Sequence, residues 1–395
     1  MWHPQLYSTM KKNILFVITS KTNMGDLALC LNWVKDLGRE QYHFGFVCDA
    51  DFLPYLDAAD TPFVFAKEQN VKDTILAAVQ SFSAHALIFA TNAFWNLPGY
   101  EGHSFGRFIL DPGDVSIPVL SFDPFEIGFD HIMPQSGAVI PFSAVPSWVY
   151  ALRYMSVTPL SDNARHFYSE SIYNKATLTG REAIIAKWNG LAGKKTIFYP
   201  LSKDRFNFIQ EHYPGYFSYL AGIFSELSAD GVQVFTIMPA QVPELAALPN
   251  VIILPSIPYH DFLSLIHAAD LYLTDSFVSC IVEAIQLETP SLLLINSEES
   301  SSLSTDSFLG QQFFPFRVWP YGMEQVSIQL ETLFEIAPCY AKAEILDRAQ
   351  VLASIRKLIF SAAEKEQLAG HCRAWKTGRK NTLPAPRTVL SGLLN

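Results

Sequence analysis

Residues 270–290 read DLYLTDSFVSCIVEAIQLETP. Leu271 to Thr274 form a short apolar run, which is typical of a strand buried on both faces, and Phe277 to Leu287 show the spacing of a helix. Pro290 follows that helix and leads into a second apolar run, Ser291 to Ile295. A strand, a turn, a helix and a strand in this order predict a βαβ unit with a parallel sheet.

The same alternation runs through the rest of the chain. In the second half, strands are predicted at Thr196–Tyr199, Val232–Ile237 and Val251–Leu254, and helices at Phe217–Leu227 and Tyr259–Ala268. In the first half, strands are predicted at Asn13–Thr19, Tyr42–Cys48, Thr61–Phe65, Ala86–Ala90 and Pro118–Phe122, and helices at Leu27–Leu37 and Val71–Phe82. The sequence therefore predicts an α/β protein with two facing, Rossmann-like, doubly wound domains.

The strand pattern lapses between Arg165 and Gly193, where only a helical segment from Arg181 to Leu191 is indicated. We therefore expect an N-terminal domain at residues 1–165, an interdomain linker at 166–192, a C-terminal domain at 193–340 and a C-terminal helical segment at 341–395. Ligands of open α/β sheets bind beyond the carboxyl ends of the strands, so a site is expected between the two domains.

Composition narrows the class of protein. With 395 residues, 49% hydrophobic and 17% charged, the chain can bury two ordinary cores. Its formal net charge of −10 makes nucleic acid a poor partner. Five cysteines without a CxxC pair indicate neither a disulfide framework nor a zinc site, and no run of about 18 apolar residues predicts a transmembrane segment. These features favour a soluble, cytoplasmic protein.

The predicted helix after Asp275 offers an anion site. Its start presents Ser276, Ser279 and backbone N–H groups at the positive end of the helix dipole, which suits a diphosphate without a metal. Glu283 lies on the same helical face and could accept hydrogen bonds from the two hydroxyls of a ribose. Alternatively, Glu283 is an ordinary solvated helix residue.

This segment resembles the donor-binding region of GT-B glycosyltransferases, which use nucleotide-activated sugars. Glu283-Ala284-Ile285 and Pro290 match the Glu-Ala-Leu, four residues and proline of that group, and Thr274 to Cys280 stand where such enzymes often show a Thr-His-Gly-Gly-type turn. Asn250 to Tyr259 resemble the strand and loop that contact the base. The chain departs from the pattern at Ser276-Phe277, in place of paired glycines, and at Glu288, in place of the glycine before the proline.

The predicted donor-binding residues are Lys203, Arg205, Tyr259, Asp275, Ser276, Ser279 and Glu283. Lys203 and Arg205 follow the first strand of the second domain, where their charges could neutralise a diphosphate, or they are part of a solvated loop. Tyr259 could contact the base or pack at the start of its helix.

A second candidate site lies at Asn23-Met24-Gly25-Asp26, between the first strand and the first helix. Asp26 could act as a general base on an acceptor hydroxyl or amine, or it completes a capping box with Asn23. The turn resembles the Gly-Asp turn of heptosyltransferases and protein-arginine rhamnosyltransferases, where the aspartate is placed as base. A similar turn occurs in polysaccharide pyruvyltransferases, although their basic, histidine-bearing helix start is missing here.

Acceptor-binding residues are predicted at Gly25, Trp95, Asp123 and Glu126. The sequence and the resemblance together favour an inverting hexosyl or deoxyhexosyl transferase, with Asp26 as base, no cofactor and no metal. Its expected partners are a nucleotide diphosphate sugar and a small-molecule, glycan or peptide acceptor. Two alternatives stay open: transfer of another activated group, such as pyruvyl or aminoacyl, and an inactive nucleotide-binding subunit.

Overall fold

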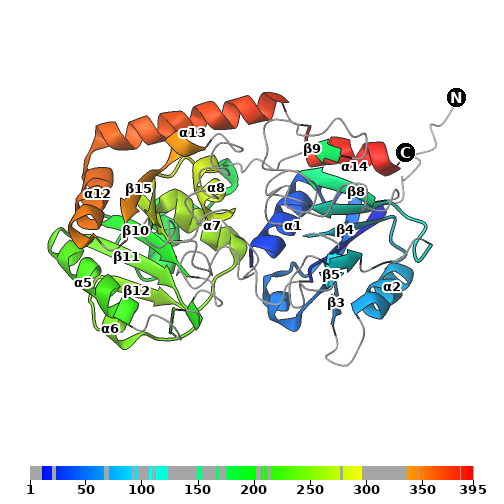
Figure 1. The fold of residues 1–395 in the computed structure, drawn as a ribbon, viewed down its shortest axis with the longest axis horizontal. Helices are drawn as coiled ribbons and strands as arrows, with labels where there is room; N and C mark the ends of the chain where they lie inside the picture. The colour runs from blue at the N-terminus through cyan, green and yellow to red at the C-terminus, as the bar shows by residue number, and fades with distance from the viewer. Residues whose placement is uncertain are drawn as a thin grey trace, which may run out of the picture.

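The structure, a computed structural model, describes residues 11–19, 24–65, 71–90, 94–96, 106–108, 110, 113–122, 149–153, 166–168, 175–201, 206–207, 209–210, 215–275, 279–295, 336–345, 347–382 and 384–394. Two lobes lie side by side in Figure 1, one formed by the first half of the chain and one mainly by the second half. Each lobe is built on a parallel sheet with helices on both faces.

The N-terminal sheet has seven strands in the order β3-β2-β1-β4-β7-β8-β9. These strands are β1 Lys12–Val17, β2 Tyr42–Cys48, β3 Thr61–Val64, β4 Ala86–Phe89, β7 Val119–Phe122, β8 Val149–Arg153 and β9 His166–Tyr168. A separate antiparallel pair consists of β5 Phe94–Asn96 and β6 Gly106–Phe108. The helices are α1 Met24–Leu37, η1 Ala50–Tyr55 and α2 Val71–Phe82.

The sequence of β1 explains why this sheet is covered on both faces. Successive strand residues point to opposite faces, so an unbroken apolar run needs an apolar cover on each. Ile14 and Phe16 pack in the cluster that includes α1, whereas Leu15 and Val17 pack in the cluster that includes α2. All four side chains are at most 1% exposed.

The C-terminal sheet has six strands in the order β12-β11-β10-β13-β14-β15. These strands are β10 Lys195–Pro200, β11 Val232–Ile237, β12 Val251–Leu254, β13 Leu271–Thr274, β14 Ser291–Ile295 and β15 Ala341–Glu344. The helical elements around it are η3 Lys175–Thr177, α3 Arg181–Lys187, α5 Gly215–Ala229, α6 Pro243–Ala246, α7 Tyr259–Ala268, α8 Ser279–Gln286, η4 Ala337–Cys339 and α12 Arg348–Phe360. Apolar side chains alternate between its two faces in the same way, Tyr199 facing α5 and Phe198 facing α7.

The last two helices connect the lobes. Helix α13, Ala362–Thr382, starts in the C-terminal lobe and runs across the top of the view toward the other lobe, and α14, Pro386–Leu394, lies in the N-terminal lobe (Figure 1). Val389 and Leu390 of α14 are buried in the same cluster as α1. The side chain of Lys12 also donates a hydrogen bond to the carbonyl of Leu394 at 2.8 Å. The end of the chain is thus part of the N-terminal core.

The two-domain α/β prediction is confirmed, but three details of the expected organisation differ. Strand β9 pairs with β8, so the N-terminal sheet extends at least to Tyr168, into the predicted linker. Residues 341–344 form β15, the edge of the C-terminal sheet, where a helix was expected. The predicted C-terminal helical segment is divided between the lobes, because the apolar face of α14 is buried against α1.

Helix α8 ends in a way that explains the unusual Glu288. Thr289 N–H donates to the carbonyl of Ala284 at 2.9 Å and Glu288 N–H to that of Ile285 at 3.0 Å, which is the Schellman arrangement. That arrangement places Glu288 in the left-handed region, at φ 59°, where glycine is favoured. The Glu288 carboxylate forms an ion pair with Lys175 of η3 at 2.7 Å. The glutamate thus joins α8 to the segment that enters the domain.

We predict that Glu288→Gly is more stable than Glu288→Ala by about 1 kcal/mol. Both variants lose the ion pair, but only glycine removes the left-handed backbone strain of about 1–2 kcal/mol. Thermal unfolding of the two variants measures this difference. Lys175→Met, which removes the 2.7 Å ion pair but keeps the 3.8 Å contact of Glu288 with Arg373 and leaves the backbone unchanged, should be nearly as unstable as Glu288→Ala. An alanine variant as stable as the glycine variant would contradict this explanation.

Among the residues that the structure describes, none of the helices is long and apolar enough to cross a membrane.

Candidate functional site

The first part of the site lies where the N-terminal sheet reverses its strand order. Helix α1 follows β1, whose neighbours β2 and β4 lie on opposite sides of it, and such switch points are where α/β domains bind ligands. Asp26 stands in the first turn of α1 and is 7% exposed. The positive end of the helix dipole stabilises a carboxylate at this position.

One turn further along α1, Cys30 is completely buried. Burial first, and then the charges of Asp26 and Cys48, raise the pKa of the Cys30 thiol. The thiol beside Asp26 is therefore neutral at physiological pH. Asp26 remains the acidic group that this turn of the helix can offer to a ligand.

The second part of the site lies at the corresponding switch point of the C-terminal sheet, between β10 and β13. Asp275 directly follows β13 and is 1% exposed. Its carboxylate accepts hydrogen bonds from Tyr199 of β10 and Tyr216 of α5, both at 3.1 Å. Tyr199 thereby joins the end of β10 to the residue that follows β13, and Tyr216 joins α5 to the same residue.

The third part joins the two lobes. Tyr259, the first residue of α7, donates a hydrogen bond to Glu283 Oε1 at 2.8 Å, and Asn32 Nδ2 of α1 donates to the Tyr259 hydroxyl at 3.2 Å. Glu283 is 6% exposed and Asn32 is 7% exposed. A partly buried hydrogen-bonded chain thus runs from the helix of Asp26 to the glutamate of α8.

The structure brings together some of the predicted site residues. Tyr259 and Glu283, selected by separate arguments, form a direct hydrogen bond. Gly25 lies in α1, Trp95 in β5 and Ser279 at the first position of α8, but the surroundings of these three residues fall outside what the structure describes. Lys203, Arg205, Ser276, Asp123 and Glu126 lie outside the described residues altogether.

Sequence reasoning missed Asn32, Tyr199 and Tyr216. Asn32 had a visible signal, because it is a polar residue inside the apolar run LALCLNWV of α1. Tyr199 had none, since a tyrosine in a buried strand is ordinary core. Tyr216 lies in a helix distant in sequence from Asp275, and only the fold brings the two together.

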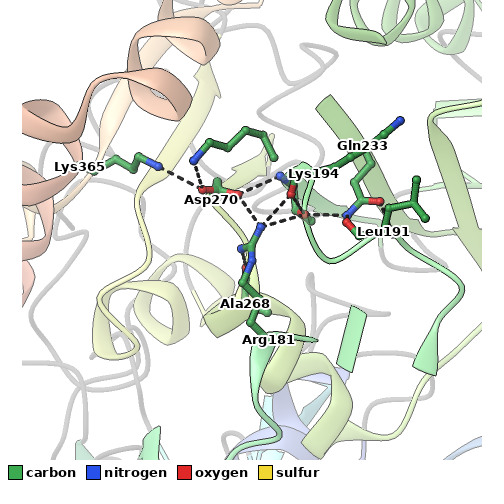
Figure 2. Close-up of polar contacts among 9 residues, drawn as sticks. Arg181, Leu191, Lys194, Gln233, Ala268, Asp270 and Lys365 are labelled. Atoms are coloured by element: carbon green, nitrogen blue, oxygen red, sulfur yellow. Dashed lines mark hydrogen bonds and ion pairs between the residues drawn. The ribbon is translucent and has the colours of Figure 1, made fainter. Parts of the chain in front are cut away.

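A different polar cluster holds the opposite end of β13. Asp270 accepts from Arg181 at 2.8 Å, Lys195 at 3.2 Å, Lys365 at 3.1 Å and Thr196 N–H at 3.0 Å (Figure 2). Burial alone would raise the pKa of Asp270, but the charge of Arg181 and these hydrogen bonds outweigh it and hold the pKa below its usual value. A strand rises about 3.3 Å per residue, so Asp270 lies roughly 16 Å from Asp275. This cluster is therefore structural.

Comparison with known proteins agrees with this architecture. Residues 209–394 match the model of a family of unknown function (DUF6365). No curated protein matches the chain. Among solved structures, the glycosyltransferase SnogD from Streptomyces nogalater is 13% identical over 98% of this chain and 100% of its own, with a TM-score of 0.58.

Two further similar structures contain a nucleotide. The spinosyn rhamnosyltransferase SpnG complexed with thymidine diphosphate is 12% identical over 97% of this chain and 100% of its own, with a TM-score of 0.58. The glycosyltransferase VinC in complex with DTDP is 12% identical over 97% of this chain and 98% of its own, with a TM-score of 0.56. At 12–13% sequence identity, the similarity to these structures establishes the fold of the chain and nothing more. The chain has the two-domain GT-B fold of glycosyltransferases.

Proposed function

We propose that this protein transfers a hexosyl or deoxyhexosyl group from a nucleoside diphosphate sugar to an acceptor hydroxyl or amine. The observation that supports the proposal most directly is the contact between lobes described above. Through Asn32 and Tyr259, the helix that carries Asp26 is connected to Glu283 of α8. In the proposed reaction the N-terminal domain, which carries Asp26, binds the acceptor, and the C-terminal domain, which carries Glu283, binds the donor.

In the proposed reaction, Asp26 removes the proton of the acceptor as the acceptor attacks the anomeric carbon. A single base is sufficient for a direct displacement, which inverts the configuration at that carbon. Gly25, Trp95, Asp123 and Glu126 are the proposed acceptor-binding residues. The proposal needs no metal and no cofactor, because the helix dipole at the start of α8 would stabilise the departing diphosphate.

On the donor side, we propose that Glu283 holds the ribose. Tyr259 donates to Glu283 Oε1, and a carboxylate can accept from several donors at its two oxygens, which is the chemistry that recognition of two ribose hydroxyls needs. Ser276, Ser279, Lys203 and Arg205 would bind the diphosphate. Asp275, held by its two tyrosines, would fix the start of the segment that precedes α8.

A thermal-shift screen against UDP, GDP, ADP, dTDP and CMP tests this function. A nucleotide at 100 times its Kd stabilises the native state by about 2.7 kcal/mol, so we expect one diphosphate to raise the Tm by about 5 °C. Glu283→Ala should weaken that nucleotide about tenfold, whereas Glu244→Ala, at an exposed position of the same domain, should not change it. If none of the five nucleotides shifts the wild-type Tm, the proposal is wrong.

A product assay with the matching nucleotide sugars then identifies the reaction. Release of the nucleoside diphosphate together with a glycosylated acceptor supports glycosyl transfer. Nucleotide binding with no turnover on any donor would favour an inactive nucleotide-binding subunit. Transfer of a pyruvyl or aminoacyl group would assign the same architecture to a different activated donor.

A further inference from the structure

The geometry points to Tyr259 as a positioning residue that orients Glu283 for the ribose and makes its orientation depend on helix α1. This inference rests on the proposed function, since it assumes that Glu283 receives the nucleotide. Tyr259 would thereby couple donor binding in one domain to the placement of the helix that carries Asp26 in the other.

The ring of Tyr259 is fixed by the C-terminal domain. It stacks on Phe262, one turn further along α7, with ring centroids 6.2 Å apart and an interplanar angle of 17°. Phe262 in turn packs edge-on against Phe198 of β10, at 5.5 Å and 67°. Because Phe198 is completely buried, this stack connects the phenol to the core of the sheet and limits where its hydroxyl can lie.

The direction of the hydrogen bonds follows from the chemistry of the three groups. A phenol has one hydrogen, and a carboxylate only accepts. The hydrogen of Tyr259 is therefore donated to Glu283, and its oxygen accepts from the amide of Asn32. The hydrogen bonds thus run in one direction, from Asn32 to Tyr259 and from Tyr259 to Glu283. The bond to the Glu283 carboxylate is the stronger of the two, because its acceptor is a carboxylate.

Helix α1 transmits the position of Asn32 to Asp26. The two residues are six positions apart in one continuous helix, which corresponds to about 9 Å along its axis. Moving α1 away from α7 would remove the Asn32 amide from the phenol and displace Asp26 at the same time. Glu283 would then still accept a hydrogen bond from Tyr259, but the position of the Tyr259 hydroxyl would be less restrained. The nucleotide sugar is therefore held best when Asp26, the proposed general base, is in its catalytic position.

Titration calorimetry of the protein with dTDP, UDP, GDP and ADP tests this role. Tyr259→Phe keeps the stacked ring and removes only the hydroxyl, so we expect the Kd of the bound diphosphate to rise about tenfold. Asn32→Ala should raise it about threefold. If Asn32 acts through Tyr259, adding Asn32→Ala to Tyr259→Phe should have no further effect.

Asn32→Asp gives a second, nearly isosteric test. The substitution replaces an amide donor by a carboxylate that competes with Glu283 for the phenolic hydrogen, so it should weaken the nucleotide about as much as Tyr259→Phe. Thr177→Val is the matched control, because it removes another contact of α1, the 3.0 Å hydrogen bond from Lys35, and leaves the side chains of Asn32, Tyr259 and Glu283 unchanged. Its Kd should stay within twofold of wild type, and the Tm of each variant identifies any loss of folding.

The outcomes separate this inference from the proposed function. If the wild type binds none of the four diphosphates, both fail. If the wild type binds one of them and Tyr259→Phe binds it within twofold of wild type, the positioning role is wrong while the proposed function stands. Additive effects of Asn32→Ala and Tyr259→Phe would also overturn the coupling between domains.

Discussion

Asp26→Asn is expected to lower kcat by about three orders of magnitude while the affinity for the nucleoside diphosphate stays within about twofold of wild type. The amide has nearly the shape of the carboxylate but cannot accept the acceptor proton, and general base catalysis typically contributes 10²–10⁴-fold. The nucleotide is assigned to the other domain, so its binding should not depend on this charge. Initial rates with a saturating donor, combined with titration calorimetry, measure the two quantities separately.

Asp36→Asn is the matched control for this prediction. Asp36 lies near the end of the same helix, ten residues from Asp26, or about 15 Å along the axis. Its substitution should leave kcat within about twofold of wild type. A wild-type rate in Asp26→Asn would remove this residue from the mechanism and transfer the role of base to the acidic pair Asp123 and Glu126.

Much of the fold can be predicted from local pattern. The predicted bounds of β2, α2, β11, β12, α7, β13 and β14 agree with the structure residue for residue. These elements lie between turns in sequence; the strands are short, mostly apolar runs, and the helices repeat their apolar residues at three- and four-residue steps. Strand β15 was missed because AKAE is short, contains two charged residues and contributes only small alanine side chains to the core at the sheet edge.

The candidate site is less predictable, because its contacts join residues distant in sequence. Glu283 could be selected because it shares a helical face with Ser276 and Ser279, and Tyr259 because it begins the next helix upstream. That the two are hydrogen-bonded depends on how α7 packs beside α8, and the part played by Asn32 depends on how the lobes meet. The same holds for Asp275, whose partners come from β10 and α5. The sequence pattern can indicate single candidate residues, but the hydrogen bonds that connect them can be identified only from the tertiary structure.

The polar cluster around Asp270 is a second network that only the tertiary structure shows, and it bears on stability. Asp270 appeared in the sequence only as the residue before a strand. In the structure its carboxylate holds the first residue of α3, which follows the interdomain segment, and a lysine of α13, which leads back to the other lobe. One partly buried carboxylate therefore attaches both of these connecting helices to the sheet.

We predict that Asp270→Asn lowers the free energy of unfolding at pH 7 by about 2 kcal/mol. Removing one partner of a buried ion pair costs about 3–5 kcal/mol, and we reduce this value because the three cations are 23–43% exposed and can be rehydrated. Urea denaturation measures the change. Asp230→Asn, which removes the more exposed ion pair with Arg356, is the control and should cost less than about 1 kcal/mol.

The pH dependence gives this prediction a second test. Because the folded-state pKa of Asp270 is lowered, its contribution to stability is complete above the unfolded pKa of about 3.9 and is lost as the pH falls through the folded pKa. The difference between wild type and Asp270→Asn should therefore be constant above about pH 5 and shrink progressively in more acidic solution. A difference that stays constant down to pH 3 would mean that the ionised carboxylate is not what holds α3 and α13. Loss of the cluster should also increase hydrogen exchange in α3 and α13 while leaving α1 and α2 of the N-terminal lobe unchanged.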